Sequence, residues 1–230
     1  EFLAQKKWAS AAAAYRSACA DERIGSLPVQ EQIRRNLAVN MADLLAYRPE
    51  VLGVLESTPT DPRFAIHVTG SGRPTVAFQS GGRLRPLFEG EDPLGYLAGC
   101  MKQLLPAREL GSCLGLLGTS DGYLATALAR HPVKLLLGRQ QCVFLLEPNP
   151  TNLLMALMIH DWSGETGPIR QKRFRMHVGA GCVEAAVGEM LADPGLPIPE
   201  VLVTALPDGQ AVQAKYNAAM SRIVQAEEAR

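Results

Sequence analysis

Length, composition and charge set the first limits on this chain. Its 230 residues can bury a sizeable core, and a composition of 47% hydrophobic and 20% charged residues excludes an intrinsically disordered protein. Lys plus Arg and Asp plus Glu number 23 each, so the net charge gives no attraction to nucleic acid, and none is expected as a partner. No apolar run approaches the roughly 18 residues of a membrane helix, so no membrane partner is expected either.

The cysteines indicate a reducing compartment. They never form a C-x-x-C pair, and four of the five lie in apolar stretches; their positions are Cys19, Cys100, Cys113, Cys142 and Cys182. This pattern predicts buried, reduced thiols with no metal site and no disulfide. Because nothing at the start has the layout of a signal peptide, the protein is expected to be cytoplasmic.

The first part of the chain predicts two helices and then a hairpin. Residues 1–57 form an N-terminal helical segment, with helices expected at about 3–20 and 28–47. Residues 58–106 contain alternating apolar positions around a Gly-Ser-Gly turn, which is typical of a β-hairpin, and then a linking helix. Asp92 is suited to cap that helix, with Pro93 as its first residue.

Residues 107–207 alternate apolar runs with helical patterns. Strands are expected at 112–118, 142–147, 173–179 and 199–206, with helices at 123–131, 152–162 and 182–193. Strands that are apolar along their whole length are typical of a parallel sheet covered on both faces, so the fold class is α/β with a Rossmann-like, doubly wound, mostly parallel sheet. Residues 208–230 form an uncapped C-terminal helix, which we expect to lead to a further domain of a longer parent chain.

The turn after the first core strand is one candidate ligand site. It reads Gly118-Thr-Ser-Asp121-Gly122, and in a doubly wound sheet such a turn lines the crevice at the switch point of strand order. Gly118, Asp121 and Gly122 are the predicted cofactor-binding residues here. The pattern departs from G-x-G-x-x-G because Ser120 replaces the middle glycine, and Asp121 could instead cap the next helix.

Glu147 is the second candidate. It ends the apolar run CVFLLE, where an acidic residue commonly binds the two hydroxyls of an adenosine ribose. The spacing from Gly118 is 29 residues, longer than the roughly 20 of the dinucleotide pattern. The alternative is a strand-end carboxylate that caps the helix beginning near Asn149.

Other polar residues are weaker candidates. His160 and Asp161 could supply an acid-base group, but a polar helix end is the preferred interpretation. A basic run follows a Gly-Pro loop and could hold a phosphate, although a solvated strand edge is preferred; its members are Arg170, Lys172, Arg173 and Arg175. His177 and Gly179 end the third core strand and are expected to border the same cleft.

Three segments together resemble the motility-associated (Maf) flagellin glycosyltransferases. They are GRPTVAFQSGGRLRPLFEGEDPLGYLAG, LGLLGTSDGYLATALARHP and CVFLLEPNPTNLLMALMIHDW, within residues 63–162. The resemblance implies a Rossmann-like domain attached to a nucleotide-sugar-dependent transferase. The positions that match the family pattern are Asp92, Gly118, Gly122 and Glu147, although the family turn is richer in glycine.

The same strand, turn and strand are also similar to class I S-adenosylmethionine methyltransferases. Those enzymes have an acidic residue just before the glycine turn, where Leu116 and Leu117 stand here. Three hypotheses follow: a glycosyltransferase-type module that binds a nucleotide or nucleotide sugar or scaffolds the transferase, a methyltransferase, and a non-catalytic interaction domain. The cofactor, if any, would be a nucleotide sugar or S-adenosylmethionine, and neither enzymatic activity nor catalytic residues are defined by the sequence.

Overall fold

The computed structural model describes most of the chain. The described residues are 27–86, 92–104, 113–131, 135–136, 139–193, 195–199, 201–204, 213–218 and 221. The helix predicted at 3–20 lies outside them, and within the helix predicted at 208–230 residues 213–218 are helical. No helix in the described part is both long and apolar enough to cross a membrane.

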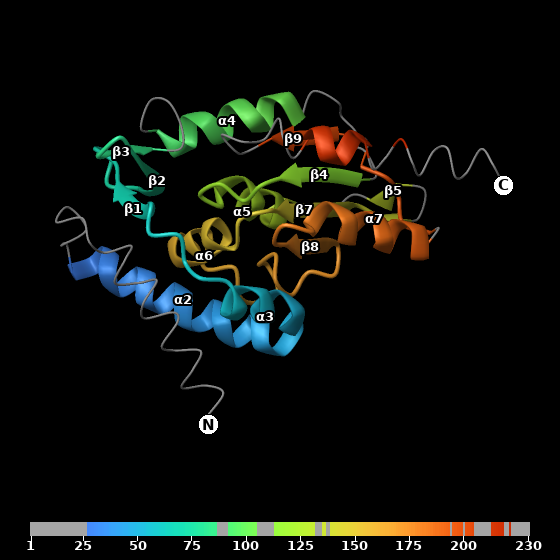
Figure 1. Cartoon of the computed structure of the whole chain (residues 1–230), viewed down its shortest axis with the longest axis horizontal. Helices are drawn as coiled ribbons and strands as arrows, with labels where there is room; N and C mark the ends of the chain where they lie inside the picture. Colours follow the sequence, from blue (N-terminus) through green and yellow to red (C-terminus); the bar gives the residue numbers. More distant parts are fainter. Residues whose placement is uncertain are drawn as a thin grey trace.

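A four-stranded parallel sheet forms the centre of the fold (Figure 1). Its strands are β4 (Cys113–Leu117), β7 (Cys142–Glu147), β8 (Phe174–Val178) and β9 (Val201–Thr204), in the order β8-β7-β4-β9. Every neighbouring pair is parallel, which confirms the parallel sheet predicted from the apolar runs. In chain order this is 3-2-1-4, the order of the first four strands in doubly wound dinucleotide-binding sheets.

Helices cover both faces of this sheet. On one face α5 (Tyr123–Arg130) and α6 (Pro150–Ile159) share a core with Leu116 and Leu145. On the other face α7 (Cys182–Ala192) packs with Phe144 and Leu146. The helix predicted at 152–162 is present as α6. It ends at Ile159, because His160 has an extended backbone.

The hairpin predicted before the core is part of a larger antiparallel sheet. β1 (Phe64–Val68) pairs with β2 (Pro74–Ser80), and β2 pairs with β3 (Arg83–Pro86). The third strand was not predicted from the sequence; Gly81 and Gly82, both with positive φ, turn the chain tightly from β2 into β3. A two-stranded hairpin of β5 (Leu135–Leu136) and β6 (Arg139–Gln140), which was not predicted, precedes β7.

The linking helix begins where the sequence predicted. α4 spans Pro93–Leu104, and the side chain of Asp92 accepts a hydrogen bond from the Leu94 amide at 3.1 Å. Asp92 therefore acts as a helix cap, which satisfies an amide that has no partner within the helix. Asp92 lies on the exposed surface of the protein.

A third layer lies outside α6. It consists of α2 (Leu27–Tyr47), α3 (Pro49–Ser57) and the β1–β2 hairpin, all of which contact α6. The helix predicted at 28–47 is confirmed as α2, whereas α3 was not predicted. All ten residues of α6 are buried, as expected for a helix that is apolar around its whole circumference and packed on every side.

The last turn of α6 is buried, and side chains from α2 cap it. The Asn36 amide donates to the carbonyls of Met158 and Ile159 at 3.1 and 2.9 Å. The Asn40 amide donates to Leu157 and His160, both at 2.7 Å, and its oxygen accepts from the Trp162 amide at 2.8 Å. The last carbonyls of a helix lack partners within the helix, and here a distant helix supplies them.

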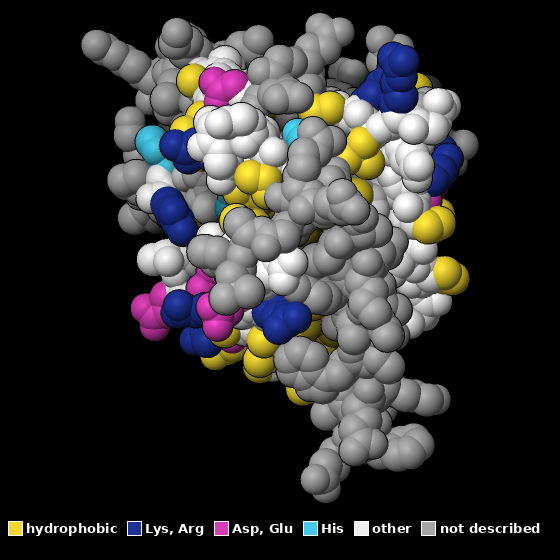
Figure 2. All heavy atoms as spheres, turned by 90° about the vertical axis from the view of Figure 1, so that its left-hand side faces the viewer, with side chains coloured by type: hydrophobic (Ala, Val, Ile, Leu, Met, Phe, Trp, Pro, Cys, Tyr) yellow, Lys and Arg dark blue, Asp and Glu magenta, His cyan; other side chains and the backbone are white. Residues whose placement is uncertain are grey.

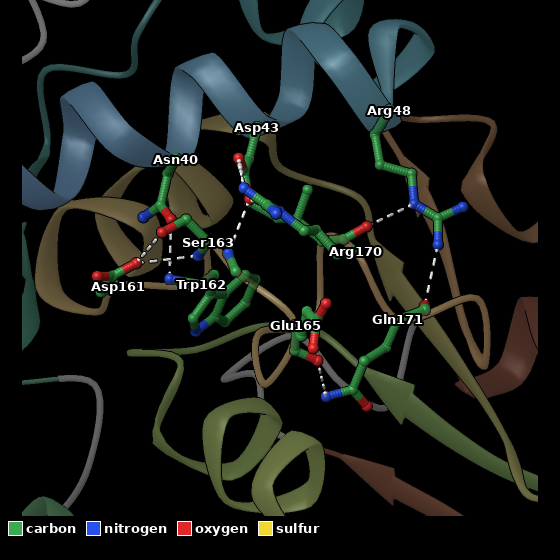
Figure 3. Close-up of polar contacts among 11 residues, drawn as sticks. Asn40, Asp43, Arg48, Asp161, Trp162, Ser163, Glu165, Arg170 and Gln171 are labelled. Carbon is green, nitrogen blue, oxygen red and sulfur yellow. Dashed lines mark hydrogen bonds and ion pairs between the residues drawn. The ribbon is translucent and has the colours of Figure 1, made fainter.

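Two charged side chains extend this contact along α2 and beyond its end (Figure 3). Asp43 receives two hydrogen bonds from Arg170, at 2.7 and 2.8 Å, and one from the Gly164 amide at 2.8 Å. Arg48 donates to three carbonyls of the same loop and of β8. We call Asn36, Asn40, Asp43 and Arg48, with the segment 157–174 that they hold, the α2 seam.

Candidate ligand site at the carboxyl ends of the strands

The predicted ligand turn, residues 118–122, lies between β4 and α5. The turn lies at the carboxyl end of β4. The next strands along the chain, β7 and β8, lie on one side of β4, and the last strand, β9, lies on its other side. Doubly wound sheets bind their ligands at this type of position. The structure thus places Gly118, Asp121 and Gly122 where the sequence argument expected them.

Three of the five residues in this turn have left-handed backbones. Gly118, Ser120 and Gly122 have φ of 96°, 53° and 84°. Ser120 is the only described residue other than glycine with positive φ, a conformation that costs a non-glycine residue roughly 1 kcal/mol. At Gly122 a Cβ would also stand 2.8 Å from the His160 ring and 3.0 Å from the Ala156 Cβ, so the space there is closed to any side chain.

Glu147 lies behind the turn, fully buried, and its carboxylate joins β7 to the turn. Its Oε2 accepts from the Thr119 backbone amide at 2.7 Å, from the Thr119 hydroxyl at 2.6 Å and from the Asn152 side-chain amide at 3.0 Å. Its Oε1 accepts from the Asn149 amide at 2.8 Å. Burial raises the pKa of Glu147, and these donors oppose that effect. Both oxygens are therefore bonded within the protein, and α6 is capped by Asn149 itself.

Asp121 is a second buried carboxylate in the turn. Its Oδ2 accepts from the hydroxyl of Thr75 in β2 at 2.9 Å. Burial raises the pKa of Asp121 to about 6. Tyr123 adds a second link to β2, because its hydroxyl donates to the Pro74 carbonyl at 2.9 Å. The β1–β2 hairpin is thus fastened over the turn.

These contacts use the amides that a phosphate would need. In a dinucleotide site, amides of the turn and of the following helix face the pyrophosphate. Here the Thr119 backbone amide donates to Glu147 and the Gly122 backbone amide donates to the Thr119 carbonyl at 2.9 Å. The Glu147 carboxylate and the Thr119 carbonyl thus occupy two amides of the turn that would otherwise be available to a ligand anion.

Some polar atoms around the turn have no hydrogen-bond partner. They are buried Ser120 Oγ, Asn152 Oδ1 and His160 Nε2. The His160 ring lies edge-on to Tyr123 at 4.3 Å, and burial lowers its pKa to about 4, so it is uncharged at neutral pH. Asp161, by contrast, is exposed and binds Ser163. The two residues of the predicted acid-base pair therefore lie in different surroundings.

The basic run is dispersed over separate partners. Arg170 pairs with Asp43, Arg173 donates to the Leu128 and Ala129 carbonyls, and Arg175 pairs with Glu189 at 3.0 Å. Lys172 is exposed. The preferred interpretation, a loop and strand edge, agrees with this arrangement, and the side chains do not converge on one point.

His177 and Gly179 follow the run at the end of β8. His177 is half-buried and bonds Glu189 at 3.0 Å across the α7 face. Gly179 has a φ of 98°, and its amide donates to the Glu147 carbonyl at 2.8 Å. Gly179 therefore borders the turn region through the backbone, whereas His177 points to α7.

A groove of about 830 Å³ lies elsewhere, between α2 and the loop after α6. Acidic, basic and amide side chains line it: Glu31, Gln32, Arg35, Asn36 and Asp161. On the face drawn in Figure 2, basic and acidic side chains likewise lie beside each other. Mixed charge of this kind gives no preference for an anionic ligand. Among the described residues, no group of three His, Cys, Asp or Glu side chains is arranged to hold a metal ion.

Sequence reasoning missed several residues that build the turn. Thr119 and Asn152 bind Glu147, and Thr75 binds Asp121 from 46 positions away. One signal was available, since a carboxylate that ends an apolar strand needs donors nearby, and Thr119 and Asn152 are polar residues at helix starts or turns. Nothing in the local sequence connected Thr75 to this site.

The fold and its site define a mixed α/β module with a four-stranded parallel sheet, a three-stranded antiparallel sheet and a glycine turn at the switch point. No family model matches the chain, and no curated protein matches it in sequence. One solved structure is similar: a Maf glycosyltransferase from Magnetospirillum magneticum AMB-1, with a TM-score of 0.51 and 14% sequence identity. The similarity covers 80% of this chain but 34% of that chain.

This likeness supports the predicted resemblance as a distant relationship of fold. It gives no support to the methyltransferase alternative. The chain spans about a third of the length of the glycosyltransferase it matches, so the activity of that whole protein does not transfer to it directly.

Proposed function

We propose that this chain is a Rossmann-like scaffold module of a glycosyltransferase-type protein, with its ligand turn closed from within. The observation that carries the proposal is that the polar groups of the turn are bonded within the protein: fully buried Glu147 accepts from the Thr119 amide, and Asp121, 3% exposed, accepts from the Thr75 hydroxyl. The solved glycosyltransferase of similar fold supports the class of protein. The module would hold a transferase domain in place rather than contribute substrate contacts.

The hairpin supports the same proposal. A nucleotide at the turn would need the space taken by β2, which is bonded to the turn through Thr75 and Tyr123. Glu147 would also have to release Thr119 or Asn149 before it could bind a ribose. Ribose binding by Glu147 and phosphate binding at Gly118 and Gly122 remain predictions that the geometry does not favour.

A nucleotide-binding function is the second candidate, and one observation favours it. Ser120 Oγ and Asn152 Oδ1 are buried without partners, and a bound polar group would satisfy them. Under this alternative, the hairpin moves aside and a nucleotide or nucleotide sugar occupies the turn.

Ligand binding to the whole chain separates the two functions. We would measure thermal unfolding with CMP, UDP, GDP, their sugar conjugates and S-adenosylmethionine, each in excess. A ligand at 100 times its dissociation constant adds about 2.7 kcal/mol, which is a clear shift of the midpoint. The scaffold proposal expects no shift with any of them, and slow hydrogen exchange at the Thr119 and Gly122 amides without ligand. A shift that is lost in Ser120→Ala would overturn it in favour of nucleotide binding.

A further inference from the structure

Two cysteines lie together at the opposite end of the sheet from the ligand turn. Cys113 is the first residue of β4 and Cys142 the first residue of β7, and the two are register partners. They therefore point to the same face of the sheet, the face that α7 covers. Their thiols are hydrogen-bonded to each other.

Polar groups surround this pair although it lies in an apolar cluster. Arg175 interacts with the Cys142 sulfur and also binds Glu189, whose second oxygen bonds His177 at 3.0 Å. Tyr216 belongs to the same buried cluster as Cys113 and is 2% exposed.

Two donors in this cluster have no acceptor. Arg175 Nε and Tyr216 Oη are both buried without a hydrogen-bond partner. Unsatisfied buried donors are costly, so a site that retains two of them beside one pair of thiols is suited to an additional oxygen atom. An oxygen bonded to a cysteine sulfur would be such an acceptor.

We propose that Cys113 and Cys142 form a peroxide-oxidisable dithiol, in which Cys142 is oxidised first and Cys113 then closes a disulfide. In the first step the Cys142 thiolate attacks a hydroperoxide, the O–O bond breaks, and an S–O bond forms as hydroxide or alkoxide leaves. In the second step the Cys113 sulfur attacks Cys142 Sγ, the S–O bond breaks, and the oxygen leaves as water with the Cys113 proton. Two thiols are oxidised to one disulfide, and the peroxide is reduced to water and an alcohol, or to two waters.

The surroundings explain why Cys142 reacts first. The hydrogen bond from Cys113 lowers the pKa of the Cys142 thiol, and the charge of Arg175 lowers it further, against the burial that raises it. Burial raises the pKa of Cys182, another buried thiol on the same face, to about 11. Thiolates are the reactive form, so Cys142 and Cys182 differ in reactivity although both are buried.

Geometry and access also fit the proposal. Neighbouring strands lie about 4.8 Å apart, within the roughly 4.4–6.8 Å between Cα atoms that a disulfide spans. Cys113 and Cys142 are at most 5% exposed, which disfavours bulky disulfide reagents. Arg175 and Glu189, with side chains 34% and 29% exposed, border the cluster where it meets solvent, and the proposal requires a small peroxide to enter beside them.

The test uses the whole chain with Cys19→Ser and Cys100→Ser, which leaves the three thiols under discussion. After hydrogen peroxide at neutral pH, the protein is denatured, alkylated and mapped by mass spectrometry. We expect a disulfide-linked peptide pair containing Cys113 and Cys142, formed at least about tenfold faster than any oxidation of Cys182. Dithiothreitol should restore both thiols.

Variants assign the order of the steps. In Cys113→Ser, a dimedone adduct should collect at Cys142; in Cys142→Ser, Cys113 should stay reduced over the same exposure; Cys182→Ser should leave the disulfide unchanged. Circular dichroism checks the fold of each variant, and the peptide map of the parent protein stands even if one variant fails to fold. Equal oxidation of Cys182 and Cys142, or absence of the linked peptide, would overturn the proposal.

Discussion

The turn at residues 118–122 and the α2 seam both fix a reversal of the chain through buried side chains, but the bonded residues are closer together in sequence in the turn than in the seam. In the turn, Glu147 binds Thr119, Asn149 and Asn152, all within 28 positions. In the seam, α2 side chains bind backbone groups more than 115 positions away. Glu147 thus fixes the turn from within the parallel sheet, with a further contact from Thr75 of the hairpin, whereas the seam fixes α2 to the end of α6 and the loop that follows it.

The difference shows two uses of buried polar groups. In the turn, the Glu147 carboxylate satisfies amides that a ligand could otherwise bind, so local stability is gained at the expense of ligand access. In the seam, asparagine side-chain amides satisfy the carbonyls at the buried end of α6, so the outer helix α2 is bonded to the core. Substitutions at each place should therefore disturb different parts of the molecule.

The largest effect is expected from Glu147→Ala. It leaves the Thr119 and Asn149 amides without acceptors inside the core, and such a loss should lower the free energy of unfolding by about 3–4 kcal/mol. Urea unfolding measures it, with Glu184→Ala as the control, since Glu184 is exposed on α7 and its loss should cost less than about 0.5 kcal/mol. A small effect of Glu147→Ala would mean that water reaches these amides and that the turn is open.

Sequence reasoning located the turn but not its internal partners. Gly118 stood out because it directly follows a buried strand, and Glu147 because it is the last residue of another. The strands themselves were found because their apolar runs are continuous. The sequence could not show that the donors around Glu147 belong to the protein rather than to a ligand. A carboxylate at a strand end has the same local pattern in both cases.

The seam was not predicted for a different reason. Asn36 and Asn40 are separated by one helical turn, which places them on one face of α2, but polar residues on a helix are typical of a solvated face. Their partners are backbone carbonyls of α6, and backbone groups leave no trace in the side-chain pattern. Only the burial of α6 on every side makes these amides necessary.

The next largest effect tests the closed space inside the turn. Gly122→Ala places a methyl group against His160 and Ala156 in addition to the cost of a left-handed backbone, and should destabilise the protein by about 2–3 kcal/mol. Gly72→Ala is the control. Gly72 has a similar φ of 78° in the hairpin, but an added Cβ there would have no neighbour within 4 Å, so this substitution should cost about 1 kcal/mol. Equal melting temperatures for the two variants would contradict the tight packing at Gly122.

In the α2 seam we expect a loss of stability somewhat smaller than that of Gly122→Ala. Asn40→Ala removes three hydrogen bonds and should cost about 2 kcal/mol, with Gln32→Ala, an exposed amide on the same helix, as the matched control. Hydrogen exchange should show faster exchange in α2 and at the Trp162 amide, with little change at the Thr119 amide. If Thr119 exchange rises equally, the two regions unfold as one unit and the distinction between them fails.

The smallest effect is the pH dependence of the intact protein, because two groups beside the turn oppose each other. The pKa of Asp121 is raised to about 6, so the folded state holds its proton more tightly, and this contribution to stability is lost as the pH rises from about 4 through 6. The pKa of His160 is lowered to about 4, so its contribution is present above the ordinary value of 6.5 and is lost as the pH falls toward 4. Between these limits the contributions of these two groups nearly cancel, and we expect their net change to be about 1 kcal/mol or less; Glu147, whose pKa burial also raises, is common to the parent protein and the variants compared below.

Substituting either Asp121 or His160 should make the effect of the other on the pH dependence of stability visible. In Asp121→Asn the free energy of unfolding should rise with pH between about 4 and 6.5 more steeply than in the parent protein, and in His160→Gln it should fall. Asp43→Asn serves as the seam control, because the hydrogen bond from Arg170 lowers the pKa of Asp43 below 3.8 and confines its effect to more acidic solutions. Urea midpoints across this range measure all three slopes. If Asp121→Asn leaves the slope unchanged, Asp121 is hydrated rather than sealed by the hairpin, and the donor it occupies is open to a ligand after all.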